Sequence, residues 1–223
     1  MPDPDPASEA APDGDSTARV IVLAGPSGSG KSRLSRRLRL PVLNLDDFYK
    51  DGSDPTLPRL DLGHERIVVD WDDPASWLHD DALEAIAALC RDGVADVPVY
   101  DIAHDGRVGH RRMHLGGATY FVAEGIFAHE VVAACRERDL LAEAVCVRHH
   151  RLVTFWRRLT RDLRERRKPP LVLLRRGLIL MREEPRVVAR AVAHGCVPLR
   201  PEQAFRRLTA RVALSRRERR TPV

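Results

Sequence analysis

Residues 25–32 carry the most specific chemical pattern of the chain, Gly-Pro-Ser-Gly-Ser-Gly-Lys-Ser. The pattern fits G-x-x-x-x-G-K-[ST], in which glycines let successive backbone N–H groups turn toward phosphate oxygens. Lys31 would reach the β- and γ-phosphates as a point charge, and the Ser32 hydroxyl would ligate Mg²⁺. We therefore predict that a nucleoside triphosphate is bound by Gly25, Pro26, Ser27, Gly28, Ser29, Gly30, Lys31 and Ser32.

Carboxylates follow two other apolar stretches. Asp46 and Asp47 come after residues 41–45, and Glu124 comes after residues 119–123. Ligands of open α/β sheets bind at the carboxyl ends of strands, so a carboxylate at Asp46 could accept the proton of a hydroxyl that attacks a γ-phosphate. A helix cap before Phe48 explains the same acidic pair equally well. Glu124 suits a contact near Mg²⁺ or is an ordinary polar residue at a strand end.

Apolar runs alternate with helical repeats from residue 18 onward, and residues 51–75 read as a long connection rich in Gly, Pro and Asp. Strands are predicted at residues 20–24, 41–45, 97–100, 119–123 and 143–147, and helices at residues 31–40 and 76–91. Strands that alternate with helices favour a mainly parallel sheet covered on both faces. The predicted class is therefore α/β.

The C-terminal third is predicted to be helical and rich in arginine, because 22 basic and six acidic residues lie from Arg148 to the end. Predicted helices cover residues 151–168, 171–182, 186–194 and 201–215. Residues 151–170 would form a lid, and residues 171–215 a helical C-terminal part. Residues 1–17, which hold five acidic and no basic residues, predict a disordered acidic tail. Residues 18–223 would then form a single domain.

Composition excludes several classes of function. The chain has no apolar run near the ~20 residues that span a bilayer, which predicts no membrane span and a cytoplasmic protein. The four cysteines lack a CxxC pair, which argues against a zinc knuckle or a disulfide scaffold. The basic C-terminal third could attract a polyanion or form solvated helix faces. Nucleic-acid binding is disfavoured, because Phe205 is the single aromatic residue after Trp156.

Five stretches together resemble the uridine kinase family of P-loop phosphotransferases, within the phosphoribulokinase/uridine kinase group. Residues 25–32 resemble its GxSGSGKS/T loop, 46–49 its D-S-F-Y, 98–101 its P-x-Y-D-F, 124–126 its E-G-I-L, and 157–166 its R-R-x-x-R-D-x-x-E-R. The likeness runs in the family's order from residue 20 to about 167. Residues 72–77 depart from the family's H-P-D-A-F-D, and no family motif is evident past Pro170.

The resemblance implies a three-layer α/β P-loop NTPase fold with a mainly parallel sheet and a helical, arginine-rich lid. It implies a kinase that uses ATP and Mg²⁺ to phosphorylate a small-molecule acceptor, foremost the 5′-hydroxyl of uridine or cytidine. Asp46 would be the general base beside Lys31, while Ser32 and Glu124 would serve the metal. The implied substrate contacts are Asp47, Tyr49, Tyr100, His104 and Arg166, and the implied catalytic arginines of the lid are Arg158 and Arg161.

Two kinds of alternative share the phosphate loop. The acceptor could be pantothenate, a sugar phosphate or an adenylylsulfate-type compound. A different class is a P-loop ATPase that switches its arginine-rich helices onto nucleic acid or a protein partner. Homo-oligomer formation is compatible with each of these.

Overall fold

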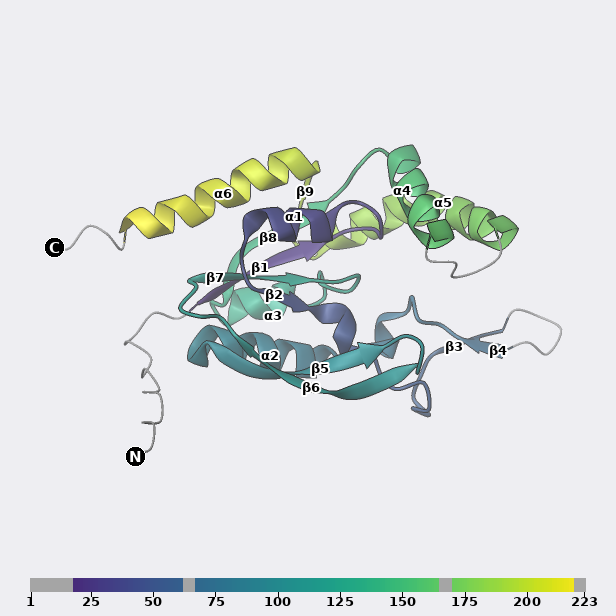
Figure 1. Cartoon of the computed structure of the whole chain (residues 1–223), viewed down its shortest axis with the longest axis horizontal. Coiled ribbons are helices and arrows are strands. Elements are labelled where there is room, and N and C mark those ends of the chain that lie inside the picture. Colours follow the sequence, from purple (N-terminus) through teal and green to yellow (C-terminus); the bar gives the residue numbers. More distant parts are fainter. Residues whose placement is uncertain (1–17, 62–66, 165–169, 219–223) are drawn as a thin grey trace, which may run out of the picture.

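The computed structural model of the 223-residue chain describes residues 18–61, 67–164 and 170–218 (Figure 1). The tail predicted for residues 1–17 lies outside these ranges. Part of the side chains of the three C-terminal helices also lies outside the description, including those of Arg158 and Arg161.

The central sheet is parallel, as predicted. Its order is β2-β7-β1-β8-β9, formed by β1 (Arg19–Ala24), β2 (Val42–Asn44), β7 (Tyr120–Glu124), β8 (Leu141–Val147) and β9 (Val197–Leu199). The middle strand, β1, consists of apolar residues after Arg19, because side chains on both of its faces are buried. This arrangement brings the carboxyl ends of β1, β2 and β7 to one edge.

Helices cover both faces of the sheet (Figure 1). On one face, α1 (Lys31–Leu38) and α6 (Pro201–Glu218) pack against Ile21 and Leu23 of β1. On the other face, α2 (His79–Asp92) and α3 (Val132–Glu137) pack against Val20 and Val22. Alternate residues of β1 therefore enter two separate apolar clusters, which makes the fold three-layered.

Two hairpins stand outside the central sheet. Residues 97–100 are a strand, as predicted, but they belong to β5 (Val94–Asp101), whose antiparallel partner β6 (Gly106–His114) was not predicted. A second hairpin of β3 (Arg59–Asp61) and β4 (Ile67–Val69) lies within the predicted long connection. Short 3-10 turns, η1 (Leu45–Phe48) and η2 (Pro74–Ser76), follow β2 and precede α2.

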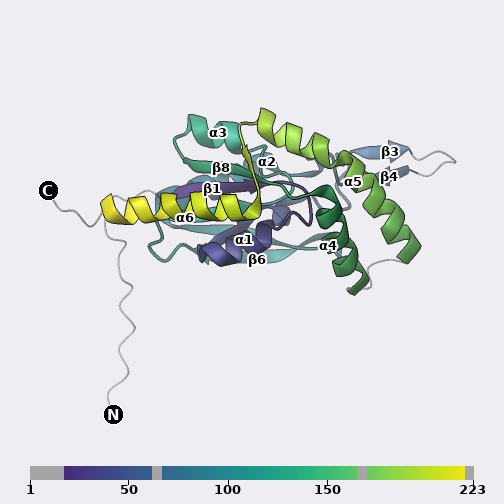
Figure 2. The ribbon, with the colours of Figure 1, turned by 90° about the horizontal axis from the view of Figure 1, so that it is seen from above.

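The segment predicted as an arginine-rich lid, residues 151–170, contains α4 (Arg151–Arg164), which packs against α5 (Pro170–Ala193). The two helices approach closely at Gly177. A Cβ atom at this position would lie 2.7 Å from the ring of Phe155, so the contact leaves no room for a side chain. The predicted break between residues 182 and 186 is wrong. Helix α5 is continuous through Pro185, and Figure 2 shows that its two halves run in different directions. Proline bends rather than ends a helix where packing holds both halves in place.

Strand β9 is a second correction, because residues 195–200 were not expected to form a strand. Three residues of β9 pair with β8, and Pro198 lies at this sheet edge, where a missing N–H is tolerated. None of the described helices is long and apolar enough to cross a membrane.

Candidate active site

The glycine loop connects β1 to α1 at the carboxyl end of the sheet. Gly25, Gly28 and Gly30 have φ values of 131°, 84° and 104°, a region that side chains disfavour. At Gly25 a Cβ atom would lie 2.3 Å from the carbonyl oxygen of Val147, so the loop can only pass β8 with glycine here. The loop therefore has the curled backbone that the sequence pattern predicted.

Lys31 begins α1 and reaches back over the loop. Its Nζ donates hydrogen bonds to the carbonyl oxygens of Gly25 (2.6 Å) and Pro26 (3.4 Å). The N-terminal end of α1 adds its partial positive charge at the same place. The Ser29 hydroxyl is fully buried in the loop and has no hydrogen-bond partner among the described residues. Ser32, in the first turn of α1, is exposed. These donors suit a phosphate group.

Glu124 lies between the phosphate loop and the acidic pair. It is paired with Leu23 of β1 on one side and with Asn44 of β2 on the other. Its carboxylate accepts a hydrogen bond of 2.5 Å from the Ser35 hydroxyl on α1. Sheet register therefore places the Glu124 carboxylate at the end of β7, the strand next to the one that leads into the loop.

Asp46 lies at the same sheet edge, in η1 directly after β2. Its Oδ1 accepts a hydrogen bond from the backbone N–H of Ile126 at 2.9 Å, and its own N–H donates to Oδ1 of Asn44 at 3.3 Å. Asp46 is exposed. The carboxylate is thus held against the turn that follows Glu124, with its surface open to solvent.

Asp47 is already engaged within the protein. Burial raises the pKa of its carboxyl group, while the charge of Arg111 and a 2.9 Å hydrogen bond from the Asn44 amide act in the opposite direction. Arg111 lies on β6, so Asp47 faces the β5–β6 hairpin. Its neighbour Asp46, by contrast, faces the turn after β7.

Tyr49 is the centre of an aromatic cluster beside η1. Its ring lies 5.7 Å from that of Trp71 and 5.9 Å from those of Tyr100 and Phe127, measured between centroids. Its hydroxyl donates to the carbonyl oxygen of Trp71 at 3.2 Å. Burial, followed by the nearby Asp46 charge, raises the Tyr49 pKa, so the phenol stays neutral. The structure therefore brings Tyr49 and Tyr100 together as an apolar wall.

His104 lies further out, in the turn between β5 and β6. Its side chain is 71% exposed, and its Nδ1 lies 2.7 Å from Oδ2 of Asp101. The Asp101 pKa is lowered by a hydrogen bond from the Ala103 N–H and then by His104. Among the described side chains, His104 thus contacts its own hairpin rather than the Tyr49 cluster.

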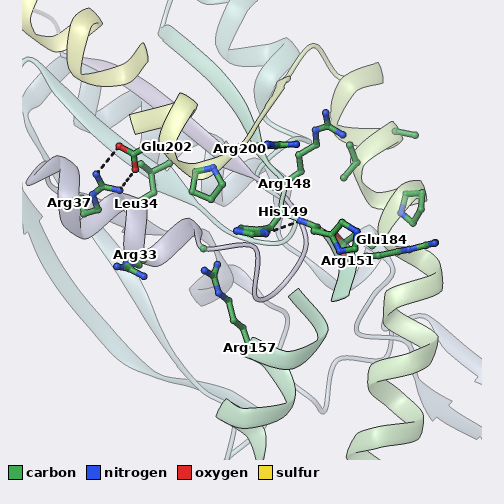
Figure 3. A pocket seen from close by; sticks show the side chains of 16 residues that line it. Arg33, Leu34, Arg37, Arg148, His149, Arg151, Arg157, Glu184, Arg200 and Glu202 are labelled. Carbon is green, nitrogen blue, oxygen red and sulfur yellow. Dashed lines mark hydrogen bonds and ion pairs between the residues drawn. The ribbon is translucent and has the colours of Figure 1, made fainter. Parts of the chain in front are cut away.

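A cavity of about 990 Å³ opens on the other side of the phosphate loop, between α1, the β8–α4 connection, α5 and the start of α6. Figure 3 shows Arg157 reaching from α4 toward the loop, and its Nη1 would lie 3.8 Å from a Cβ atom at Gly30. Arg148 and Arg200 add further positive charge. Burial, followed by the charges of Arg157 and Arg200, lowers the pKa of His149. The cavity favours an anionic ligand.

The sequence predictions did not include Arg148, Arg200 or His149 among the candidate site residues. One signal could have found Arg148 and His149, because they directly follow the carboxyl end of β8, where ligands of α/β sheets bind. Arg200 depends on β9, which was not predicted. Arg158 and Arg161 fall on the backbone of α4, but their side chains lie outside the description, and Arg166 lies wholly outside it.

Fold and loop together define the class of this protein. A parallel sheet of order β2-β7-β1-β8-β9, a glycine loop that opens α1, a carboxylate at the end of β7 and another directly after β2 are the architecture of a P-loop nucleotide-binding protein.

Comparison with known proteins then identifies the family. Residues 20–169 match the model of the phosphoribulokinase/uridine kinase family, and the chain belongs to this family. A uridine kinase of Deinococcus deserti is 35% identical over 172 residues, which cover 73% of this chain and 77% of that protein. A uridine kinase of Streptococcus mutans is 28% identical over 154 residues, 66% of this chain and 69% of that protein.

A solved structure shares the fold. A putative fructose transport system kinase from Silicibacter sp. TM1040 superposes with a TM-score of 0.57 at 16% identity, covering 82% of this chain and 88% of that one. The resemblance drawn from the motifs is thus confirmed at the level of family, kinase class and α/β fold.

Proposed function

We propose that the protein transfers the γ-phosphoryl group of Mg²⁺-ATP to the 5′-hydroxyl of a pyrimidine nucleoside, uridine or cytidine. The observation that carries the proposal is the placement of Asp46 at the same sheet edge as the phosphate loop, one strand beyond Glu124. The uridine kinases among the relatives support the choice of acceptor. Because ATP is the donor, the proposed activity belongs to the cytoplasm.

Phosphate binding would be carried by residues 25–32. The positive φ values of three glycines fit a ligand with several acceptor oxygens, and so does the buried Ser29 hydroxyl, which has no hydrogen-bond partner among the described residues. Lys31, which now donates to carbonyls of its own loop, would turn its ammonium group to the β- and γ-phosphates. Ser32 and Glu124 would hold Mg²⁺, which supplies neutralisation of charge on the phosphate oxygens.

Asp46 would accept the proton of the acceptor hydroxyl. The Ile126 N–H engages Oδ1, so Oδ2 is the oxygen that we assign to the proton. The hydroxyl oxygen then forms the new bond to the γ-phosphorus, the bond to the leaving ADP oxygen breaks, and the proton remains on Asp46 until solvent removes it. A carboxylate oxygen that is open to solvent and within reach of a bound hydroxyl can perform this step.

Acceptor binding would use the aromatic wall of Tyr49 and Tyr100, with Asp47 and His104 of the same region as further contacts. We extend the proposal to the lid, where Arg158, Arg161 and Arg166 would approach the transferring group. Spread positive charge stabilises such a transition state.

The test is a panel of acceptors with product masses determined: nucleosides, pantothenate and sugars, each with Mg²⁺-ATP. We expect uridine or cytidine to gain one phosphoryl group per ATP consumed. Asp46→Asn should lower kcat by about 10²–10⁴-fold, the range for loss of a general base. Asp96→Asn, an exposed aspartate on β5, is the matched control and should be unchanged.

Two results would contradict the proposal. Unchanged turnover in Asp46→Asn would remove the base assignment. Absence of any phosphorylated hydroxyl compound, together with oligonucleotide binding that weakens steeply as salt rises, would favour the ATPase switch.

A further inference from the structure

Three side chains converge where the end of α5 meets the segment before α3. None of them belongs to the kinase site described above. His129 and Glu130 lie in the connection between β7 and α3, and His194 directly follows α5. Their ligand atoms all lie within 4.8 Å of one another. Glu130 lies between the two imidazoles, with its Oε1 3.2 Å from His129 Nε2 and its Oε2 3.8 Å from His194 Nε2.

His129 is the most unusual of the three residues, because its imidazole is buried while one ring nitrogen, Nε2, makes no hydrogen bond to the described residues. The residue is 5% exposed, and Nε2 has no hydrogen-bond partner within the described ranges, since the contact with Glu130 lacks hydrogen-bond geometry. The ring also hydrogen-bonds the backbone of Ile126. Metal-binding histidines commonly fix one ring nitrogen on a backbone carbonyl in this way, which orients the other toward the ion.

We propose that His129, Glu130 and His194 form a binding site for one divalent transition-metal ion, with Zn²⁺ as the best-matched ion. Two imidazole nitrogens and one carboxylate are a common protein ligand set for zinc. Mg²⁺ prefers oxygen ligands, so this site is chemically distinct from the magnesium site of the proposed reaction.

The surroundings are consistent with nitrogen and oxygen ligation. Cys196 follows His194 by two residues, but among the described residues its Sγ is not one of the ligand atoms that converge here. His194 is 35% exposed, which leaves a route for the ion. The charge of Arg190 opposes a cation, and the Glu130 carboxylate offsets it.

The ion would join two segments that are far apart in the sequence. Figure 2 shows the C-terminal half of α5 alongside α3, and Ala191 of α5 is buried in the same apolar cluster as Val131 and Val132. The same half of α5 lines the cavity beside the phosphate loop through Val188 and Ala189. A bound ion would hold the C-terminal end of α5 in place. It would also stabilise the folded chain by mass action.

The experiment is a calorimetric titration of chelator-treated full-length protein with Zn²⁺, without nucleotide or acceptor. We expect one ion per chain. His194→Ala and Glu130→Gln should each weaken binding about 100-fold or more, because even loss of a residue behind the ligands costs 10–100-fold. The matched control is His110→Ala, an exposed histidine on β6, which should bind Zn²⁺ like the wild type.

Co²⁺ provides a second readout that reports the ligands directly. The Co²⁺-loaded wild type should show visible ligand-field bands without thiolate charge-transfer absorption, and His194→Ala should lose these bands. The partly exposed His194 is chosen because replacement of the buried His129 endangers folding, and circular dichroism checks each variant.

Failure to bind Zn²⁺, unchanged affinity in both folded variants, or thiolate charge-transfer bands would each overturn the proposal. None of these results depends on the proposed kinase reaction, because the titration contains neither of its substrates.

Discussion

Gly125 lies directly against Asp46, so its missing side chain decides where the carboxylate sits. A Cβ atom at Gly125 would lie 2.8 Å from Cβ of Leu45 and 2.9 Å from Oδ1 of Asp46. Gly125→Ala must therefore displace Asp46 from its hydrogen bond with Ile126. We expect kcat to fall about tenfold or more, since small misplacements of a reacting group are costly.

Gly109→Ala is the matched control for this substitution, because no atom lies within 4 Å of a Cβ at Gly109 on β6. Steady-state kinetics and urea unfolding of both variants separate activity from stability. Equal kcat for Gly125→Ala and Gly109→Ala would show that the position of Asp46 does not matter for turnover.

At the scale of elements, η1 depends on Trp77, which follows η2. Its indole is 4% exposed, and Nε1 donates to the carbonyl oxygen of Leu45 at 2.7 Å. Trp77→Phe removes the donor and leaves that buried carbonyl unpaired. We expect the free energy of unfolding to fall by about 1–3 kcal/mol, the cost of a lost buried partner. Urea unfolding measures it.

Trp156→Phe on α4 is the control for this change, because Trp156 is 60% exposed. Its free energy of unfolding should stay within about 0.5 kcal/mol of the wild type, as for most surface substitutions. If Trp77→Phe were equally neutral, the hydrogen bond to Leu45 would not be holding η1.

Helix α4 presents Arg157 to the start of α1, beside Gly30. We expect Arg157→Ala to weaken ATP binding about tenfold or more, because charge-assisted contacts contribute about 1.5–3 kcal/mol. Arg186→Ala on α5 is the control, since its side chain is 80% exposed and its ion pair with Glu183 spans 3.9 Å. Calorimetric titration with ATP at one fixed ionic strength compares the two variants. Equal affinities would exclude a nucleotide contact by Arg157.

At the scale of the whole molecule, burial in the core determines how reactive the cysteine thiols are. All four cysteines are buried, and burial raises the pKa of Cys90 and Cys146 to about 11 and of Cys135 and Cys196 to about 12. The thiolate is the reactive form. We expect a chromogenic thiol reagent at pH 8 to modify the native chain slowly and all four thiols after denaturation.

The same shifts predict how stability depends on pH. An exposed thiol in the unfolded chain loses its proton near its ordinary pKa of 9.0, while the folded thiols keep theirs. The unfolded state then binds fewer protons, so the free energy of unfolding falls as pH rises above about 9. Urea midpoints at pH 8 and pH 10 test the direction. Rapid modification of a native cysteine, or a higher midpoint at pH 10, would contradict this account of the core.

Much of the site was predictable because its determinants are local. The glycines of the loop, the apolar residues of β1 and the polar residues that end β2 and β7 are each recognisable within a few residues. Parallel strands end at one edge of a sheet, so Asp46 and Glu124 could be expected near the loop without knowledge of the register.

Other features could not be predicted, because they depend on contacts between distant segments. Strand β9 has three residues, and it becomes a strand by pairing with β8. Pro185 indicated a helix end, yet the packing of α5 against α4 and against the core carries the helix through it. Strand β6 has one buried residue, Met113, so it lacked the apolar alternation by which strands are recognised.

By itself, the sequence determined the phosphate loop, the parallel α/β class and the kinase family. The reason is that glycine geometry and strand patterning depend on residues that are close together in the sequence. The tertiary structure decided which arginines line the cavity beside the phosphate loop, how Asp46 and Asp47 differ, and that His129 meets His194. These contacts join residues that are far apart in the sequence. Packing, rather than local conformational preference, therefore selects the neighbours of each side chain.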